Sequence, residues 1–213
     1  MQEYNKDTCM NTMFDMQESL QNAIGAKRGT ICPNTWNSDI PDKYRTMAIE
    51  SGYYMMSTVT ELFEYFEQYK KDNYQFTDLV KFELIDAWHF VMNQLLYLNI
   101  KPTQTIEWFY DRAKENFDNA NFAGRDLYHI VGTVVEVMGD MYQHHPYKKW
   151  KTYTPEQEVA MHADRQKYGE AILIKFMELF VATGMKPEDI WKFYYEKNAE
   201  NFRRQQPGGR YEK

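Results

Sequence analysis

The sequence predicts an all-α protein in which residues 1–213 form one helical bundle. Apolar residues recur every three to four positions along nearly the whole chain, and no stretch shows the period of two that marks a β-strand. Aromatic residues make up 16% of the chain, with only 10 glycines and 7 prolines, which indicates a well-packed core rather than disorder. A chain of 213 residues is long enough to bury such a core.

The apolar spacing and the helix-ending residues define the expected elements. The first helix is expected to end near Gly25, and residues 26–43 read as a long loop that carries Trp36. Loops of this length in compact domains tend to be lids or binding loops. Gly184 is well placed to end a long helix, because glycine accepts the left-handed backbone found there. The predicted helices span residues 12–24, 45–69, 78–99, 104–118, 125–143, 155–183 and 188–202.

Composition excludes several classes of function. The net charge of −6 disfavours a nucleic-acid partner, because binding to a phosphate backbone normally needs a basic face. Cys9 and Cys32 are too few for a disulfide framework, which favours a reducing compartment. The N-terminus has no signal-peptide pattern, and no run of 18 apolar residues occurs. We therefore expect a soluble cytoplasmic protein that binds neither nucleic acid nor a membrane.

Two pairs of acidic residues carry most of the functional information. Glu61 and Glu64 are three residues apart on one predicted helix, and Glu83 and Asp86 are three apart on the next. Residues at this spacing share a helix face, so two antiparallel helices would bring four carboxylates together. Such a cluster cannot ionise in an apolar setting without compensation, and hard divalent cations with oxygen ligands are the usual one. The pattern predicts a magnesium site.

The second acidic pair is the stronger signal, because its helix is apolar almost all round. Its polar residues fall within an arc of about 140° at 100° per residue. A narrow polar stripe on a buried helix indicates a function for it. The stripe consists of Glu83, Asp86, His89, Asn93 and Gln94.

An internal repeat with an offset of 85 residues is also visible. Residues 100–102 resemble residues 185–187, and residues 115–117 resemble residues 200–202. At this offset the positions of Glu83 and Asp86 fall on Tyr168 and Ala171, so the second copy lacks the acids. The sequence thus predicts a duplicated helical unit in which only one half is active.

The order of these motifs resembles a known group of enzymes. A Glu-x-x-Glu motif, 18 intervening residues and a Glu-x-x-Asp motif are similar to the all-α nucleoside triphosphate pyrophosphatase superfamily, which includes the MazG-type enzymes and the dimeric dUTPases. Two further segments, Asp86-Ala87-Trp88-His89-Phe90 and Lys197-Asn198-Ala199-Glu200-Asn201-Phe202-Arg203-Arg204-Gln205, resemble the dimeric dUTPases. The resemblance implies a magnesium-dependent homodimer that hydrolyses dUTP to dUMP and pyrophosphate.

The resemblance also implies roles for individual residues. Glu61, Glu64, Glu83 and Asp86 would bind Mg²⁺, with Glu61 or Glu64 also positioning the attacking water. The expected phosphate-binding residues are Lys197, Asn201 and Arg204, since Lys197 and Arg204 can share one helix face. By the resemblance, Gln17 would bind the base and His89 would reach the nucleoside. Gln21, one helical turn from Gln17, is also expected at the base because an amide can pair with a uracil edge, and Trp36 could cover the base or anchor the loop.

Several alternatives stay open at this level. Hydrolysis of dCTP or of a broad range of dNTPs is one, because flipping a side-chain amide exchanges uracil for cytosine recognition. A di-iron bundle is another, since Asp86 and His89, like Asp126 and His129, form acid–histidine pairs at helical spacing. A non-catalytic helical interaction protein is the third. Aromatic residues in the helices at 104–118 and 188–202 support a homodimer, because they offer more apolar surface than one small core can cover.

Overall fold

The prediction of an all-α fold is confirmed. The computed structural model describes residues 3–37, 43–119, 127–144, 154, 156–157 and 165–206, and all regular secondary structure within them is helical. The elements are α1 (Cys9–Arg28), η1 (Pro33–Asn37), α2 (Lys43–Lys71), α3 (Asp78–Leu96), α4 (Ile106–Asn119), α5 (Leu127–His144), α7 (Arg165–Ala182) and α8 (Pro187–Gln205).

The first helix is longer than its predicted range of 12–24. It ends at Arg28 and is capped by Gly29, which adopts a left-handed backbone with φ 65° and donates its N–H to the carbonyl of Gly25. Gly25 itself is helical, and a Cβ atom there would lie 2.6 Å from the Cβ of Cys32. The absence of a side chain at Gly25 therefore lets the following loop pack closely against the helix. The prediction that Gly25 ends the helix was wrong. The predicted loop at 26–43 is shorter and contains η1.

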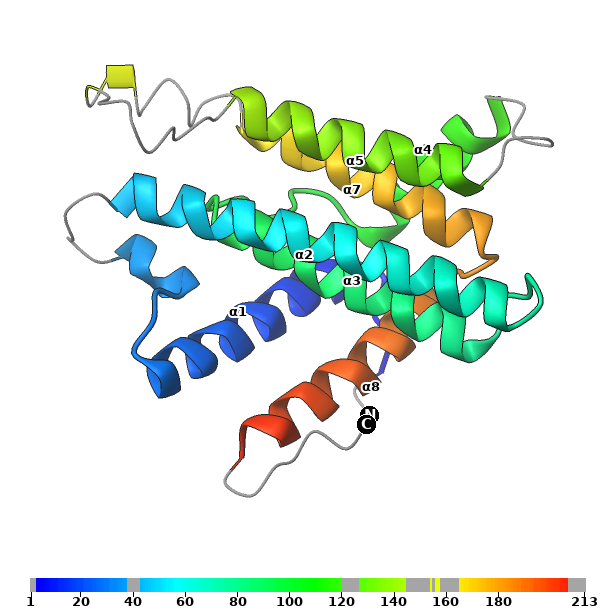
Figure 1. Ribbon diagram of the computed structural model, residues 1–213, viewed down its shortest axis with the longest axis horizontal. Helices are drawn as coiled ribbons and strands as arrows, with labels where there is room; N and C mark the ends of the chain where they lie inside the picture. Colours follow the sequence, from blue (N-terminus) through cyan, green and yellow to red (C-terminus); the bar gives the residue numbers. More distant parts are fainter. Residues whose placement is uncertain are drawn as a thin grey trace.

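Helices α2 and α3 form an antiparallel hairpin across the middle of the molecule (Figure 1). Thr77 begins α3 by accepting a hydrogen bond from the N–H of Val80. The buried face of α3 includes Leu84, Trp88 and Val91, each 0% exposed. This packing fixes how the acid-bearing faces of the two helices meet.

The other helices form two layers around this hairpin. Helices α4, α5 and α7 pack together on one side, and α1 and α8 lie against each other and against α3 on the opposite side (Figure 1). The first and last described helices are therefore neighbours in space. No helix in the described part of the chain is both long enough and apolar enough to cross a membrane.

The predicted repeat appears in two helix ends. Asn99 and Gly184, 85 residues apart, both have a left-handed backbone, with φ 57° and 75°. The next N–H in each copy donates to the carbonyl five residues earlier, from Ile100 to Leu95 and from Met185 to Phe180. The two copies then differ, because α8 begins at Pro187 whereas α4 begins only at Ile106.

The aromatic residues of α4 and α8 do not form an exposed surface. Phe109, Trp191, Phe193 and Tyr194 are all less than 9% exposed, and Trp108 is partly buried against the core. The layers of the bundle cover them within one chain. The argument that these helices form a dimer interface was therefore wrong, whereas the dimer itself stays a prediction.

Candidate active site

Three of the four predicted acidic ligands form one cluster. Glu61 comes from α2, and Glu83 and Asp86 come from α3. One carboxylate oxygen of each lies within 4.8 Å of the others. Glu64 is exposed one turn from Glu61 and lines an adjoining pocket of about 390 Å³ together with Glu83. The hairpin thus gathers a compact triad, with Glu64 at its outer edge.

The acids of this cluster resist ionisation. Burial raises the pKa of Glu61 to about 7, and the nearby charge of Asp86 adds to the effect. Burial likewise raises the pKa values of Glu83 and Asp86. A bound cation would stabilise the ionised forms of these buried acids.

Helix α8 brings a lysine to the cluster. The Lys197 ammonium lies 2.6 Å from a carboxylate oxygen of Asp86, and both side chains are largely buried. This contact lowers the pKa of Asp86 but does not outweigh its burial. The predicted phosphate-binding and metal-binding residues therefore meet at one place, although α3 and α8 are far apart in the sequence.

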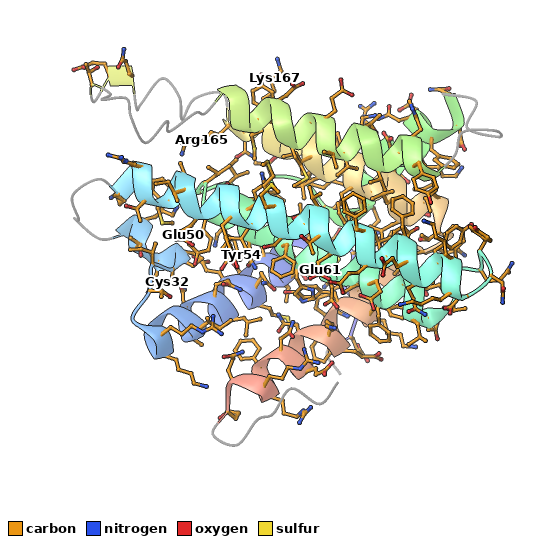
Figure 2. The ribbon with its side chains drawn as sticks, viewed as in Figure 1. Cys32, Glu50, Tyr54, Glu61, Arg165 and Lys167 are labelled. Atoms are coloured by element: carbon orange, nitrogen blue, oxygen red, sulfur yellow. The ribbon has the colours of Figure 1, made fainter. Side chains whose placement is uncertain are left out.

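A cavity of about 430 Å³ opens between α1, α2, α3 and α8. Its volume is in the range of small-molecule sites. Figure 2 shows Tyr54 and Glu61 on the side of α2 that faces this space. The lining includes eight residues predicted for the site: Gln17, Gln21, Glu61, Asp86, His89, Lys197, Asn201 and Arg204.

The cavity has an acidic end and an end where amide and aromatic side chains gather. Asp86, His89 and Asn93 follow one another along α3, and Glu61 and Tyr54 follow in the opposite direction along α2. Seven residues of helix separate Asp86 from Asn93, or about 10 Å. The Tyr54 ring stacks on Phe90, with centroids 6.1 Å apart. Aromatic and amide groups thus lie about 10 Å from the acids.

Polar side chains from α1, α2 and α3 meet at the amide and aromatic end. Gln17 donates from Nε2 to Oδ1 of Asn93 over 2.7 Å. The Tyr54 hydroxyl donates to Oε1 of Gln21 over 2.9 Å. Gln17 and Asn93 are 1% and 2% exposed, so water competes little for these hydrogen bonds.

His89 is held as a neutral acceptor. Its Nδ1 lies 2.8 Å from the carbonyl of Ile85, so Nδ1 carries the proton and donates it. Burial lowers the pKa of His89 to about 4. Its ring stacks on Tyr194, with centroids 4.6 Å apart. The buried Nε2 has no hydrogen-bond partner within the described residues, and this nitrogen can therefore accept one from a ligand.

The comparison with protein-family models now identifies the chain. The model described as dUTPase matches residues 9–209, nearly the whole chain. The chain belongs to the all-α dUTPase family. The family resemblance seen in the acidic and C-terminal motifs is thereby confirmed.

A relative of this dUTPase-family chain matches over a short segment. The dCTP pyrophosphatase of Enterobacteria phage LZ5 is 61% identical to it over 33 residues. The match covers 16% of this chain and spans 19% of the phage protein. No solved structure gives a significant match.

The oxygen ligands that the acidic cluster offers fit magnesium. The metal-capable set in the described part of the chain contains Glu61, Glu83 and Asp86 and no histidine or cysteine. Carboxylate oxygens suit Mg²⁺, whereas iron and zinc sites commonly include nitrogen or sulfur ligands. Burial raises the pKa values of all three acids, and the charge of Asp86 raises those of Glu61 and Glu83 further, so a bound cation would favour their ionised forms.

Two sequence-based assignments find no support in this geometry. Trp36 lies on η1 and is not among the residues that line either pocket. For the di-iron alternative, His89 stacks on Tyr194 and His129 is exposed on α5, and neither joins the metal-capable cluster. The partner residue Asp126 lies outside the described residues.

Sequence reasoning missed several cavity residues. Tyr54 lies seven residues before Glu61, so the same helix face could have indicated it. Asn93 was part of the polar stripe but received no role. Arg28 adds a cation from the end of α1. Tyr194 and Asn198 lie behind the cavity wall, and no spacing rule connects them to Gln17.

The stability of the metal-free protein is expected to depend on Glu61. Its carboxyl loses a proton at a pKa near 4.5 in the unfolded chain and at a pKa of about 7 in the folded protein. Between these two pH values the folded protein binds more protons at this carboxyl than the unfolded chain does. The contribution of Glu61 to the stability of the fold therefore falls as the pH rises. Thermal unfolding in EDTA from pH 5 to 8 should show a smaller fall for Glu61→Gln than for the wild type.

Glu67→Gln, an exposed residue on the same helix, is the control for this measurement. It should keep the wild-type slope. Added Mg²⁺ should stabilise the wild type more at pH 8 than at pH 6, because the cation binds ionised carboxylates. Equal slopes for Glu61→Gln and the wild type would contradict the assignment.

Proposed function

We propose that the protein is a dUTP diphosphatase, which uses Mg²⁺ to hydrolyse dUTP to dUMP and pyrophosphate. The observation that supports this best is the meeting of the acidic cluster with Lys197 and Arg204 in one cavity. Membership of the dUTPase family gives independent support. A site for a metal-bound triphosphate needs cationic side chains that bind the phosphate oxygens and carboxylates that bind the metal ions.

In this proposal Glu61, Glu83 and Asp86 would hold Mg²⁺, and Glu64 would complete the set from the edge. When bound, the ion neutralises charge on the phosphate oxygens and favours ionisation of the attacking water. Glu61 or Glu64 positions that water against the α-phosphorus. The water oxygen bonds to the α-phosphorus and gives one proton to the carboxylate that positions it. The bond from that phosphorus to the α–β bridging oxygen breaks, and pyrophosphate leaves with the electron pair.

The cations of α8 stabilise the leaving group. Lys197, Asn201 and Arg204 all line the cavity, as spacings of four and three residues on one helix face allow. Arg204 is oriented by an ion pair with Glu200. Lys197 donates to Asp86, and it would turn to a phosphate oxygen when a cation occupies the cluster.

The bond that breaks can be identified with ¹⁸O-labelled water. With dUTP and Mg²⁺, we expect the label in dUMP and none in pyrophosphate, because water attacks the α-phosphorus. EDTA should abolish the reaction. Orthophosphate and dUDP as first products, or label in pyrophosphate, would contradict the proposal. Running dCTP, dTTP and dATP in parallel tests the specificity.

Hydrolysis of dCTP to dCMP is the second candidate. The match to a phage dCTP pyrophosphatase favours it. The same acids and cations would serve, since the two substrates differ only in the base. A rate with dCTP above that with dUTP would favour this candidate.

A homodimer is part of the proposal, with α2 as its interface. Tyr53, Met56 and Phe63 are 68%, 59% and 66% exposed and lie along one face of α2. Tyr53 also lines the cavity and Phe63 the adjoining pocket. A second copy on this face would cover the apolar stripe and shield both openings from water.

Met56→Glu is expected to produce monomers, because it places a charge in the middle of this stripe. Light scattering after gel filtration should give twice the chain mass of 25.6 kDa for the wild type and the single mass for the variant. Leu79→Glu, on α3 and 61% exposed, is the control and should stay dimeric. A wild type that elutes as a monomer at micromolar concentration would refute the dimer.

A further inference from the structure

The amide of Gln17 is held by a chain of hydrogen bonds that starts at a backbone group. The Tyr194 hydroxyl lies 2.8 Å from the carbonyl of Met13 and 3.3 Å from Oε1 of Gln17. A hydroxyl has one proton, and the closer carbonyl can only accept. Tyr194 therefore donates to Met13, and its oxygen is left to accept.

The direction of the Tyr194 hydrogen bond also fixes the orientation of the Asn198 amide. Asn198 has its amide nitrogen 3.1 Å from the Tyr194 oxygen and 3.5 Å from Oε1 of Gln17. Because the Tyr194 proton is already used, Asn198 must turn its NH₂ group toward the hydroxyl. The same NH₂ group then faces Gln17, which meets it with its carbonyl oxygen.

This series of hydrogen bonds ends at the wall of the cavity that Gln17 and Asn93 line. With its oxygen toward Asn198, Gln17 points its nitrogen at Asn93 and donates to Oδ1 over 2.7 Å. Asn93 in turn keeps its NH₂ group for other partners, and it lines the cavity. Reversing Gln17 would set two donors against each other at Asn198. Tyr194 and Asn198 are both 0% exposed, so water cannot compensate.

We propose that Tyr194 and Asn198 are positioning residues that fix the Gln17 amide in one orientation and so decide which pyrimidine base the cavity accepts. The inference deepens the proposed function and rests on it, because it takes the ligand to be a pyrimidine nucleotide. When the phosphates of that nucleotide lie at the acidic cluster and the cations of α8, its base reaches the side-chain amides and the rings of Tyr54 and Phe90.

Uracil and cytosine differ in what they require of an amide. Uracil offers a carbonyl beside an N–H, and cytosine offers an amino group beside an unprotonated nitrogen, so one orientation of an amide pair suits only one base. An amide that is free to flip serves both. A fixed amide leaves buried groups of the wrong base unpaired, which costs roughly 10- to 100-fold in affinity.

The test compares kcat/KM for dUTP and dCTP with Mg²⁺ present. We expect the wild type to prefer one base by at least about tenfold, and Tyr194→Phe to reduce the ratio to about threefold or less by improving use of the poorer base. Asn198→Leu should do the same. The double variant should match either single variant, because both break one chain. Tyr65→Phe removes a buried hydroxyl without a partner among the described residues and should keep the wild-type ratio.

A binding measurement separates this inference from the proposed reaction. Titration calorimetry of dUMP and dCMP without metal reads the base preference whether or not hydrolysis occurs. We expect the wild type to show the same preference and Tyr194→Phe to lose it. No hydrolysis of either triphosphate, with this binding preference intact, would overturn the proposed function alone. An unchanged ratio in Tyr194→Phe, or a wild type that shows no preference, would overturn the inference.

Discussion

Replacement of Asp86 by asparagine, or of Glu83 by glutamine, is expected to lower turnover about a thousandfold while the fold stays intact. Both changes keep the shape of the side chain and remove a charge from the cluster with Glu61. Stabilisation of transition-state charge by a metal is worth several kcal/mol, and about 1.4 kcal/mol corresponds to a tenfold change in rate. Pyrophosphate release at saturating dUTP and Mg²⁺ measures the effect.

The matched control for these variants is Asp78→Asn. Asp78 is on the same helix, is exposed and, among the described residues, pairs only with Lys81, so its loss should change the rate less than about twofold. Circular dichroism and thermal unfolding of each variant check the fold. Turnover within tenfold of the wild type for Asp86→Asn would show that the cluster is not the metal site.

Replacement of Lys197 by glutamine is expected to have two effects of opposite sign. The variant should bind a triphosphate about 10- to 100-fold more weakly, because it loses a charge-assisted hydrogen bond. It should bind Mg²⁺ more tightly in the absence of nucleotide, because the lysine no longer competes for Asp86 at 2.6 Å. A purely structural lysine would not produce both changes.

Calorimetry with a non-hydrolysable dUTP analogue, with dUMP and with Mg²⁺ alone measures these effects. The loss should be much larger for the triphosphate than for dUMP, and it should shrink at high salt because part of the attraction is screened. Arg204→Ala should show the same difference between the two nucleotides. Lys192→Gln, an exposed lysine on the same helix, should match the wild type. Equal losses for both nucleotides would place Lys197 away from the phosphates.

The sequence determined the fold class and half of the site. Helical periodicity indicated the helices, because it depends only on local spacing, and the acids of α2 and α3 could be paired because a short connection forces neighbouring helices to pack. The motif order likewise identified the family, which a match over residues 9–209 confirms. The prediction that Gly184 ends a helix is confirmed by its left-handed backbone just after α7. The same prediction for Gly25 was wrong, since a close contact with Cys32 and not a helix end explains that residue.

Only the tertiary structure decided how distant segments meet. The contact of Lys197 with Asp86 depends on α8 returning to α3, and the cavity depends on α1 lying beside α8. Burial of the aromatic residues on α4 and α8 also depends on this layering, and so the predicted dimer face was misplaced. The hydrogen bonds from Met13 through Tyr194 and Asn198 to Gln17 join residues about 180 positions apart. Periodicity carries no information on such contacts, because they arise from packing between helices and not from spacing within one.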